Sequence, residues 1–243
     1  MTGLLALTSA KHAPGVTTAA IALALAAGPE PVSLIVEADP AGGDLAARCD
    51  LAVSPGLGSL AASARNGAAL DLTVNVQALP AGPYALLAPP SPDLTTSALD
   101  ALGDRLIDGL SMWDGTVVAD CGRWQPGGPA ARLVRAADAV LVVLRPTVEG
   151  VEHVRGRLGE ITAAAMGPIG ALVVGDRPYP AAEVADALGI PLAGTLPLDP
   201  KAVRGLERRT IGAEARRSTI VRAARSTLDA MSQWPQPKSE VWA

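Results

Sequence analysis

Residues 4–18 read LLALTSAKHAPGVTT: an apolar run, a short loop, and then a helical pattern that opens with two threonines. The run at residues 4–8 is nearly continuous, as in a parallel strand that is buried on both faces. Where such a strand passes through a tight loop into a helix, backbone N–H groups and the positive helix end favour an anion, and threonine hydroxyls can reach a metal ion. The stretch therefore predicts a phosphate-binding loop, with contacts from Pro14, Gly15, Val16, Thr17 and Thr18.

The same alternation of apolar runs and helical patterns continues along the chain. Further strands are predicted at residues 33–39, 116–120, 139–144 and 169–174, with weaker candidates at 84–88 and 192–196. Helical patterns lie between them, at residues 17–27, 44–51, 57–66, 94–112, 129–137, 151–165 and 181–188, and then at 201–209 and 218–234. Strands separated by helices imply right-handed βαβ crossovers. We therefore expect one α/β domain over residues 1–234, with a doubly wound, mostly parallel sheet and helices on both faces, followed by a flexible tail at 235–243.

The composition fits a soluble globular protein of the cytoplasm. Apolar residues make up 49% of the 243 residues and charged residues 18%, which excludes wholesale disorder. Two cysteines, Cys49 and Cys121, do not make a disulfide framework, so a reducing compartment is expected. No basic segment precedes the apolar start, and the longest apolar stretch, residues 19–27, is far shorter than the roughly 20 residues of a membrane span.

Charge is distributed unevenly. Residues 1–200 hold 11 Lys and Arg against 20 Asp and Glu, whereas residues 201–230 hold eight against three. The region from Arg204 to Arg225 is therefore a candidate surface for an acidic partner, with nonspecific DNA first and an anionic membrane second. Apolar residues recur at helical spacing in 218–234, and we expect that stripe to pack on the sheet rather than enter a membrane. The alternative is a solvated face, in which the arginines pair locally with acidic neighbours.

Two carboxylates are predicted to reach the phosphate-binding loop. The second strand ends in Glu-Ala-Asp at residues 37–39, and a later strand ends in Asp-Cys-Gly at 120–122. Ligands of open α/β sheets bind at the carboxyl ends of the strands, so Asp39 and Asp120 are expected beside Lys11 and Thr17, as a magnesium–nucleotide site requires. The structural alternatives are that Lys11 is a solvated loop lysine and that both aspartates only cap the next elements.

These motifs resemble the ParA/MinD superfamily of deviant Walker-type P-loop ATPases, including its pilus-positioning TadZ/CpaE branch. The family loop KGGxGKTT aligns with KHAPGVTT at residues 11–18. The resemblance implies ATP or ADP with Mg²⁺ as ligands and a homodimer in which Lys11 reaches the partner's nucleotide. It further implies catalytic roles for Lys11 and for Asp39, which orients the attacking water. Thr17 and Asp120 become the metal ligands, and Gly122 becomes the switch glycine.

The resemblance also places nucleobase contacts late in the chain. Residues 194–200, GTLPLDP, resemble the family's G-x-I-P-x-D segment beside the adenine, which implicates Pro197 and Asp199. Asp176 and Arg177 stand where the family has its base-contacting asparagine.

The loop departs from the family pattern at its most charged position. Val16 replaces the lysine that pairs with the β- and γ-phosphates, and His12 and Ala13 replace two glycines. Three interpretations follow. The chain is a nucleotide-dependent switch that positions a pilus or secretion machine or a chromosome locus, with weak or lost hydrolysis; or it is a pseudo-ATPase scaffold; or it is an enzyme similar to dethiobiotin synthetase. Val16 argues against the enzyme, because phosphoryl chemistry depends on the missing lysine.

Overall fold

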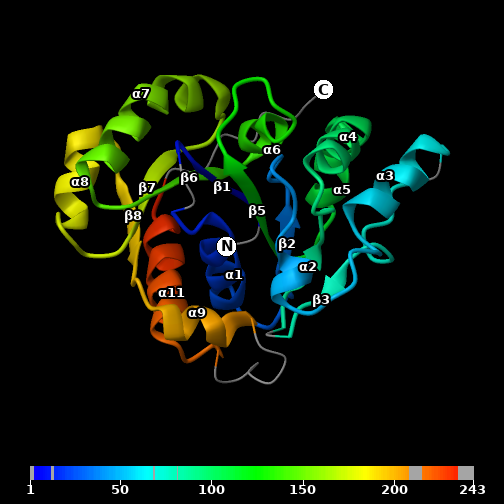
Figure 1. Ribbon diagram of the computed structural model, residues 1–243, viewed down its shortest axis with the longest axis horizontal. Coiled ribbons are helices and arrows are strands. Elements are labelled where there is room, and N and C mark those ends of the chain that lie inside the picture. The colour runs from blue at the N-terminus through cyan, green and yellow to red at the C-terminus, as the bar shows by residue number, and fades with distance from the viewer. Residues whose placement is uncertain (1–2, 12–13, 68, 81, 208–214, 235–243) are drawn as a thin grey trace.

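One sheet runs through the molecule (Figure 1). The computed structural model describes residues 3–11, 14–67, 69–80, 82–207 and 215–234. Their strands are β1 (Gly3–Ser9), β2 (Leu34–Glu37), β3 (Gln77–Ala78), β4 (Tyr84–Leu86), β5 (Thr116–Arg123), β6 (Ala139–Leu144), β7 (Ile169–Val174) and β8 (Leu192–Leu196). They lie in the order β3-β4-β2-β5-β1-β6-β7-β8, and every neighbouring pair is parallel except β3 with β4. The predicted doubly wound, mostly parallel sheet is confirmed.

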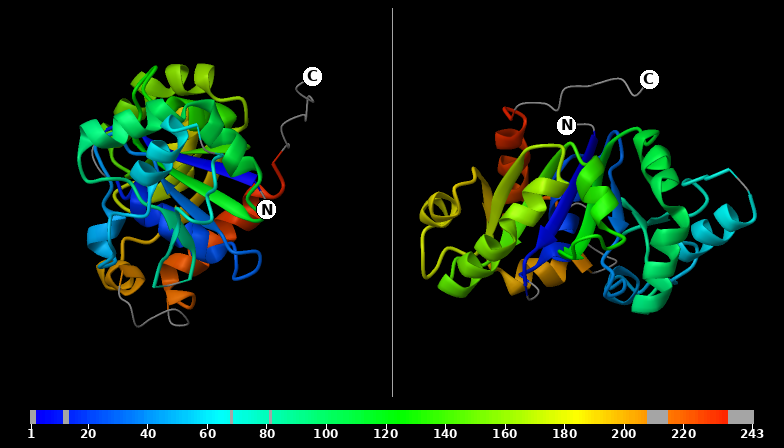
Figure 2. Two further views of the ribbon diagram at one scale, coloured as in Figure 1. Left: turned by 90° about the vertical axis from the view of Figure 1, so that its right-hand side faces the viewer. Right: turned by 90° about the horizontal axis from the view of Figure 1, so that it is seen from above.

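Helices cover both faces of the sheet, as the two further views show (Figure 2). One face carries α1 (Val16–Ala26), α2 (Leu45–Arg48), α9 (Pro200–Glu207) and α11 (Thr219–Met231). The other carries α3 (Leu57–Arg65), α4 (Pro92–Leu102), α5 (Asp104–Ser111), α6 (Ala131–Ala136), α7 (Val148–Ala164) and α8 (Ala181–Leu188). Side chains of β1 alternate between the two cores, with Ala6 in one and Leu5 and Leu7 in the other. Such strands read as continuous apolar runs because both faces are buried.

Helix α1 is the centre of its face. All of its residues from Ala19 to Ala26 are buried, and α11 packs its apolar side against α1 and β8, as the stripe in residues 218–234 predicted. The last turn of α1 contains no basic residue of its own. Instead Arg216 donates to the carbonyl oxygen of Leu25 at 3.3 Å, and Arg225 to that of Ala26 at 3.5 Å. These two arginines of the basic region therefore satisfy helix carbonyls that would otherwise lack donors.

One predicted helix is wrong. Residues 94–112 form α4 and α5 rather than one helix, because Gly103 at φ +52° ends α4 and donates its N–H to the carbonyl oxygen of Leu99 at 2.9 Å. The antiparallel strand β3 was not predicted at all, since two residues carry no periodicity. Arg208, Arg209 and the tail at 235–243 lie outside the described residues. Within the described ranges, no helix is both long and apolar enough to cross a bilayer.

Candidate functional site

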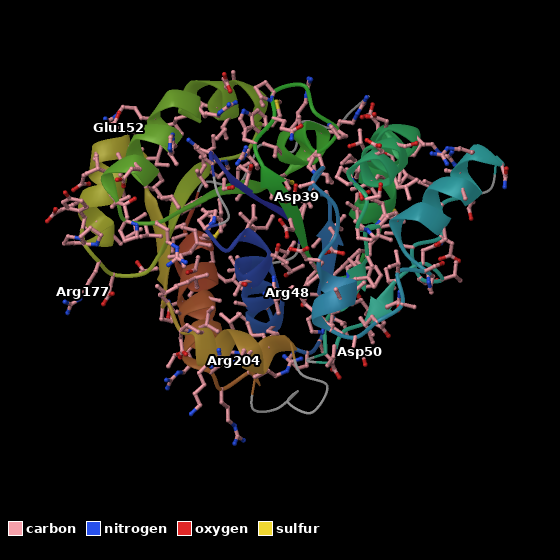
Figure 3. All side chains as sticks on the ribbon, in the orientation of Figure 1. Asp39, Arg48, Asp50, Glu152, Arg177 and Arg204 are labelled. Carbon is pink, nitrogen blue, oxygen red and sulfur yellow. The ribbon has the colours of Figure 1, made fainter. Side chains whose placement is uncertain are left out.

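The carboxyl ends of β2, β5 and β1 meet, because these three strands are neighbours and run parallel. The phosphate-binding loop follows β1, Asp39 lies two residues beyond β2, and Asp120 and Gly122 lie in the last part of β5. The structure thus brings the predicted loop and both predicted carboxylates to one place. Figure 3 shows Asp39 and Arg48 in this central region, away from Arg177 and Arg204 at the periphery.

The loop enters α1 through a glycine. Gly15 is the N-cap at φ +108° and ψ 35°, a left-handed conformation that favours glycine, and it offers no side chain to cap the helix. No atom of the described residues lies within 4 Å of the position that its Cβ would occupy, so on their side this approach to the helix N-terminus is open. Val16, the first helical residue, is only 6% exposed and packs in the apolar core around α1. The position that a phosphate-binding lysine would occupy is therefore buried and uncharged.

Thr17 and Asp120 form a pair beneath this helix end. The Thr17 hydroxyl hydrogen-bonds to the Asp120 carboxylate, and the Gly122 N–H donates to Asp120 Oδ1 at 3.1 Å. Burial raises the pKa of Asp120 to about 6, with Asp39 acting in the same direction and the Thr17 and Gly122 hydrogen bonds opposing it.

A hydroxyl and a carboxylate are oxygen ligands of the kind that Mg²⁺ prefers, so the pair fits a magnesium ion. Among the residues that the structure describes, no group of three His, Cys, Asp or Glu side chains could hold a metal ion. A magnesium ion here would take its remaining ligands from water and, with a nucleotide bound, from phosphate oxygens.

Asp39 lies directly over Gly122. A Cβ at residue 122 would stand 2.0 Å from Asp39 Cγ, and Gly122 itself has φ +57°, so any larger residue would both clash and be strained. Asp39 Oδ1 accepts a hydrogen bond from the Ala41 N–H at 2.8 Å. Burial raises the pKa of Asp39, and the nearby Asp44 adds to this effect, whereas the Ala41 N–H and Arg123 oppose it. Close approach between these two segments fixes the Asp39 carboxylate beside the end of β5.

The sequence reasoning missed the role of Glu37. This carboxylate is 2% exposed and accepts three backbone N–H groups: those of Asp44 at 2.7 Å and Leu45 at 2.8 Å on Oε1, and that of Ala88 at 3.0 Å on Oε2. Burial, together with the charge of Asp120, raises the pKa of Glu37 to about 7 against these hydrogen bonds. Glu37 therefore joins the end of β2 to the start of α2 and to the segment after β4. An acidic residue at the end of an otherwise apolar strand was the signal available.

Arg48 was missed as well. It is the last residue of α2, half-buried, and its Nη2 donates to Thr18 Oγ1 in the first turn of α1 at 2.9 Å. Its charge lowers the pKa of Asp120, which places the guanidinium within electrostatic range of the magnesium pair. No sequence signal pointed to this contact, because Arg48 and Thr18 are far apart in the sequence and come together only in the folded structure.

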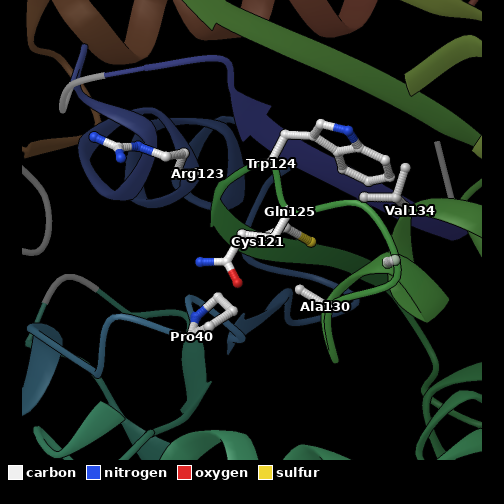
Figure 4. A pocket seen from close by; sticks show the side chains of 9 residues that line it. Pro40, Cys121, Arg123, Trp124, Gln125, Ala130 and Val134 are labelled. Atoms are coloured by element: carbon white, nitrogen blue, oxygen red, sulfur yellow. The ribbon is translucent and has the colours of Figure 1, made fainter. Parts of the chain in front are cut away.

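Lys11 is exposed and borders a cavity of about 230 Å³ between the end of β1 and the start of α7. Arg145 and His153 line the same cavity. His12 and Ala13, the two replaced glycines, lie outside the described residues. A second cavity, of about 10 Å³, lies beneath the loop that follows β5 (Figure 4). Pro40, Cys121 and Trp124 are among its lining residues, and its volume suits about one water molecule.

The predicted nucleobase residues lie apart from this centre. Asp176 and Arg177 follow β7 and are exposed, with β6 standing between β7 and β1. Pro197 follows β8, the edge strand.

Asp199 is engaged in structural bonds. Its carboxylate accepts the N–H groups of Lys201 at 3.0 Å and Ala202 at 2.9 Å and the Thr219 hydroxyl at 3.1 Å, which lowers the pKa of Asp199. Asp199 therefore caps α9 and links it to α11.

Comparison with known proteins points to one fold. No protein-family model matches the sequence, and no curated protein matches it either. Septum site-determining protein MinD of Pyrococcus horikoshii OT3, complexed with Mg-ADP, is similar with a TM-score of 0.75 and 18% identity over 96% of this chain and 97% of that chain. A ParA family ATPase from Chlorobium tepidum TLS gives 0.72 and 17% over 95% and 98%.

A third similar structure is a chain of the MinC:MinD cell division protein complex of Aquifex aeolicus, with a TM-score of 0.69 and 16% identity over 97% and 98% of the two chains. Identities this low establish the architecture and leave the activity to be argued from the site. The chain therefore has the fold of the MinD and ParA ATPases, as the resemblance of its motifs predicted.

Proposed function

We propose that this protein binds ATP or ADP with Mg²⁺ at the ends of β1, β2 and β5 and acts as a nucleotide-dependent dimeric switch. The observation that carries the proposal is the joint arrangement of Thr17, Asp120, Gly122 and Asp39. A hydroxyl–carboxylate pair at the N-terminus of a loop-preceded helix, with a second carboxylate packed on a glycine, suits a bound magnesium nucleotide.

Each residue has a distinct task in this proposal. The N–H groups at the start of α1 would hold phosphate oxygens, with Gly15 leaving the approach open. Thr17 and Asp120 would hold the magnesium ion, which when bound supplies positive charge to the phosphates. Asp39 would orient an attacking water, and the exposed Lys11 would extend to the nucleotide of the second subunit. Asp176, Arg177 and Pro197 are proposed to flank the base, with Asp199 supporting that side through α9.

Affinity and turnover are expected to be low, because Val16 is buried and brings no charge to the phosphates. A hydrogen bond to a charged group contributes roughly 1.5–3 kcal/mol, so the lost lysine would cost at least about tenfold in affinity. A second candidate function follows from the same observation: a pseudo-ATPase scaffold that keeps the fold and dimer surface without hydrolysis. Phosphate-release kinetics separate the two, since only the switch shows turnover that responds to nucleotide and Mg²⁺.

The switch would position a larger cellular machine, such as a pilus or secretion apparatus or a chromosome locus, in the manner of the TadZ/CpaE branch. The MinC:MinD complex is a case in which a protein of this fold is assembled with a protein partner. We propose a cytoplasmic protein that is recruited to the membrane or the nucleoid. Sedimentation velocity with ATP, ADP and no nucleotide tests the switch: a dimer with ATP and Mg²⁺ alone supports it, and one unchanging species in all three conditions contradicts it.

Recruitment would use the basic region between Arg204 and Arg225. Arg216 and Arg225 are engaged by α1, so among the described residues of this region the exposed Arg204, Arg217 and Arg222 are the arginines proposed to meet phosphate groups. Nonspecific DNA is the first candidate and anionic lipid the second. Gel-shift and liposome sedimentation compare the wild type with a triple alanine variant of these three, and with a control triple at the exposed Arg132, Arg135 and Arg155. Binding that falls with salt and is lost only in the first variant supports the proposal. Absence of binding at low salt contradicts it.

A further inference from the structure

Three acidic residues lie at or just beyond the carboxyl ends of β2 and β5, the strands beside the phosphate-binding loop: Glu37, Asp39 and Asp120. Asp120 raises the proton affinity of Glu37 through like charge, and Asp39 does the same to Asp120. An anionic phosphate entering this field is repelled unless cations offset the carboxylates. The loop itself supplies no cation in its helical part, because residue 16 is a valine. A nucleotide site built on this chain therefore needs positive charge from another element.

Arg48 is placed to supply it. Its Nη2 lies 2.9 Å from the Oγ1 of Thr18, the residue after the proposed magnesium ligand Thr17. Its positive charge lowers the pKa of Asp120. The backbone of Arg48 is held in place as well, since its N–H donates to the Asp44 carbonyl oxygen at 3.0 Å. The N–H groups of Asp44 and Leu45 are in turn bound by the buried Glu37. The guanidinium is thus anchored through α2 to β2, next to the strands that carry the site.

We propose that Arg48 binds the nucleotide phosphates and replaces the charge that a lysine at position 16 would bring. The inference rests on the proposed function, because it assigns a residue to the same site. A guanidinium carries five N–H donors in a fork, so Arg48 can keep its bond to Thr18 and still donate to a phosphate oxygen. The positive charge would then come from the last residue of α2, beside the first turn of α1, rather than from the loop.

A purely structural role is the alternative. Arginine in the last turn of a helix interacts favourably with the negative end of that helix, which needs no ligand. Arg65 provides a matched control, since it is likewise the basic residue in the last turn of its helix, α3, and bonds to Ser97 on the opposite face of the sheet. If Arg48 acted only on the end of its helix, Arg48→Ala and Arg65→Ala would change the nucleotide affinity to the same extent.

The test is a titration with a fluorescent ATP analogue in the presence of Mg²⁺, with thermal melting of each variant alongside. Arg48→Ala is expected to weaken binding by about 10- to 100-fold, the size of one charge-assisted hydrogen bond, whereas Arg65→Ala changes it less than about twofold. Arg48→Lys keeps the charge without the fork and is expected to fall between wild type and Arg48→Ala. Val16→Lys is expected to raise the affinity more in Arg48→Ala than in wild type, because the lysine would replace the lost charge; a structural role predicts the same gain in both backgrounds.

The outcomes separate the two claims. If wild type binds the analogue and Arg48→Ala binds equally well, Arg48 has no phosphate role while the proposed function stands. If wild type and Val16→Lys both fail to bind, the nucleotide site and this inference fall together. If Arg48→Ala does not fold, Arg48→Lys and Arg48→Gln decide the matter: a larger loss of affinity with Gln than with Lys supports the inference, and equal affinity in both overturns it.

Discussion

The two sides of the candidate site are built in different ways. On the carboxylate side, Glu37 and Asp120 are each 2% exposed, and Asp39 is pressed against a glycine that tolerates no Cβ. On the loop side, Lys11 is exposed and Val16 is part of the apolar core. The carboxylate side is fixed by buried hydrogen bonds, whereas the loop side has an apolar, buried side chain at position 16.

This difference separates the two parts of the proposed site. Buried carboxylates with raised pKa values are costly unless a cation or a reacting group offsets the cost. Position 16 carries no charge, so in the proposed site the offsetting charge comes from Mg²⁺, Lys11 and Arg48. The predictions below test whether the carboxylate side works and whether the loop side limits it.

The largest effect is expected from Asp39→Ala. If Asp39 orients the attacking water, its loss lowers turnover by about 10²- to 10⁴-fold while nucleotide affinity changes little. Phosphate release under single-turnover conditions, with protein in excess over ATP, measures this even when the wild type is slow. Asp44→Ala is the matched control, because Asp44 is an exposed neighbouring carboxylate that makes no side-chain cap bond to α2. Turnover equal to wild type in Asp39→Ala would refute the assignment.

A smaller effect is expected on stability as the pH changes. Folding raises the pKa of Glu37 from about 4.5 to about 7, so between these values the native state holds more protons than the unfolded chain. The free energy of unfolding therefore falls as the pH rises through this window, by roughly 3 kcal/mol for Glu37, and Asp120 acts in the same direction up to about pH 6.

Urea unfolding between pH 5.5 and 8 measures this dependence in wild type and in Glu37→Gln. The variant cannot ionise, so its slope with pH is expected to be shallower, although its stability is lower because its amide N–H faces the Ala88 N–H. A wild type that becomes more stable across this range would mean that the three N–H groups keep Glu37 ionised throughout.

Asp120→Ala is expected to weaken nucleotide binding by about tenfold or more in Mg²⁺ and hardly at all in EDTA. A magnesium ion must also displace the proton of Asp120, whose pKa is raised to about 6, so the benefit of Mg²⁺ in wild type declines below that pH. Titrations at pH 5.5 and 7.5 measure both effects. An equal loss of affinity with and without Mg²⁺ would assign Asp120 to folding and not to the metal.

Val16→Lys has the smallest expected effect, a gain of about tenfold in nucleotide affinity. The new ammonium has to turn from the core toward the loop, which is why the gain is modest. Nanomolar binding by wild type that this substitution leaves unchanged would show that the loop does not hold the phosphates in the manner proposed.

Much of the fold was predictable because both faces of the sheet are covered. Strands such as β6 are apolar at every position, and their order with the helices fixes a doubly wound topology. Helix ends were less predictable. Helix α7 begins three residues before the expected start, at Val148, because the Thr147 hydroxyl accepts the Gly150 N–H at 3.1 Å. Here the side-chain cap, and not the apolar periodicity, determines where the helix begins.

The site was predictable where strand order decides it and not where long-range contacts do. Asp39 and Asp120 follow neighbouring parallel strands, so their convergence followed from the pattern. Glu37 and Arg48 act through bonds to Ala88 and Thr18, which lie 51 and 30 residues away in sequence. Nothing local in the chain encodes those partners. For Asp199 the resemblance implied a contact with the base. The structure shows that its carboxylate accepts three hydrogen bonds that link α9 to α11, which the resemblance did not indicate.

Isothermal titration of the wild type with ATP, with Mg²⁺ and then in EDTA, tests the central claim most directly. Buried carboxylates beside an uncharged position 16 predict weak but measurable binding in Mg²⁺ that weakens further in EDTA, because the metal is one of the cations that offset Asp39 and Asp120 against the phosphates. Absence of heat at high protein and ATP concentration in Mg²⁺, or an affinity that EDTA leaves unchanged, would contradict the account.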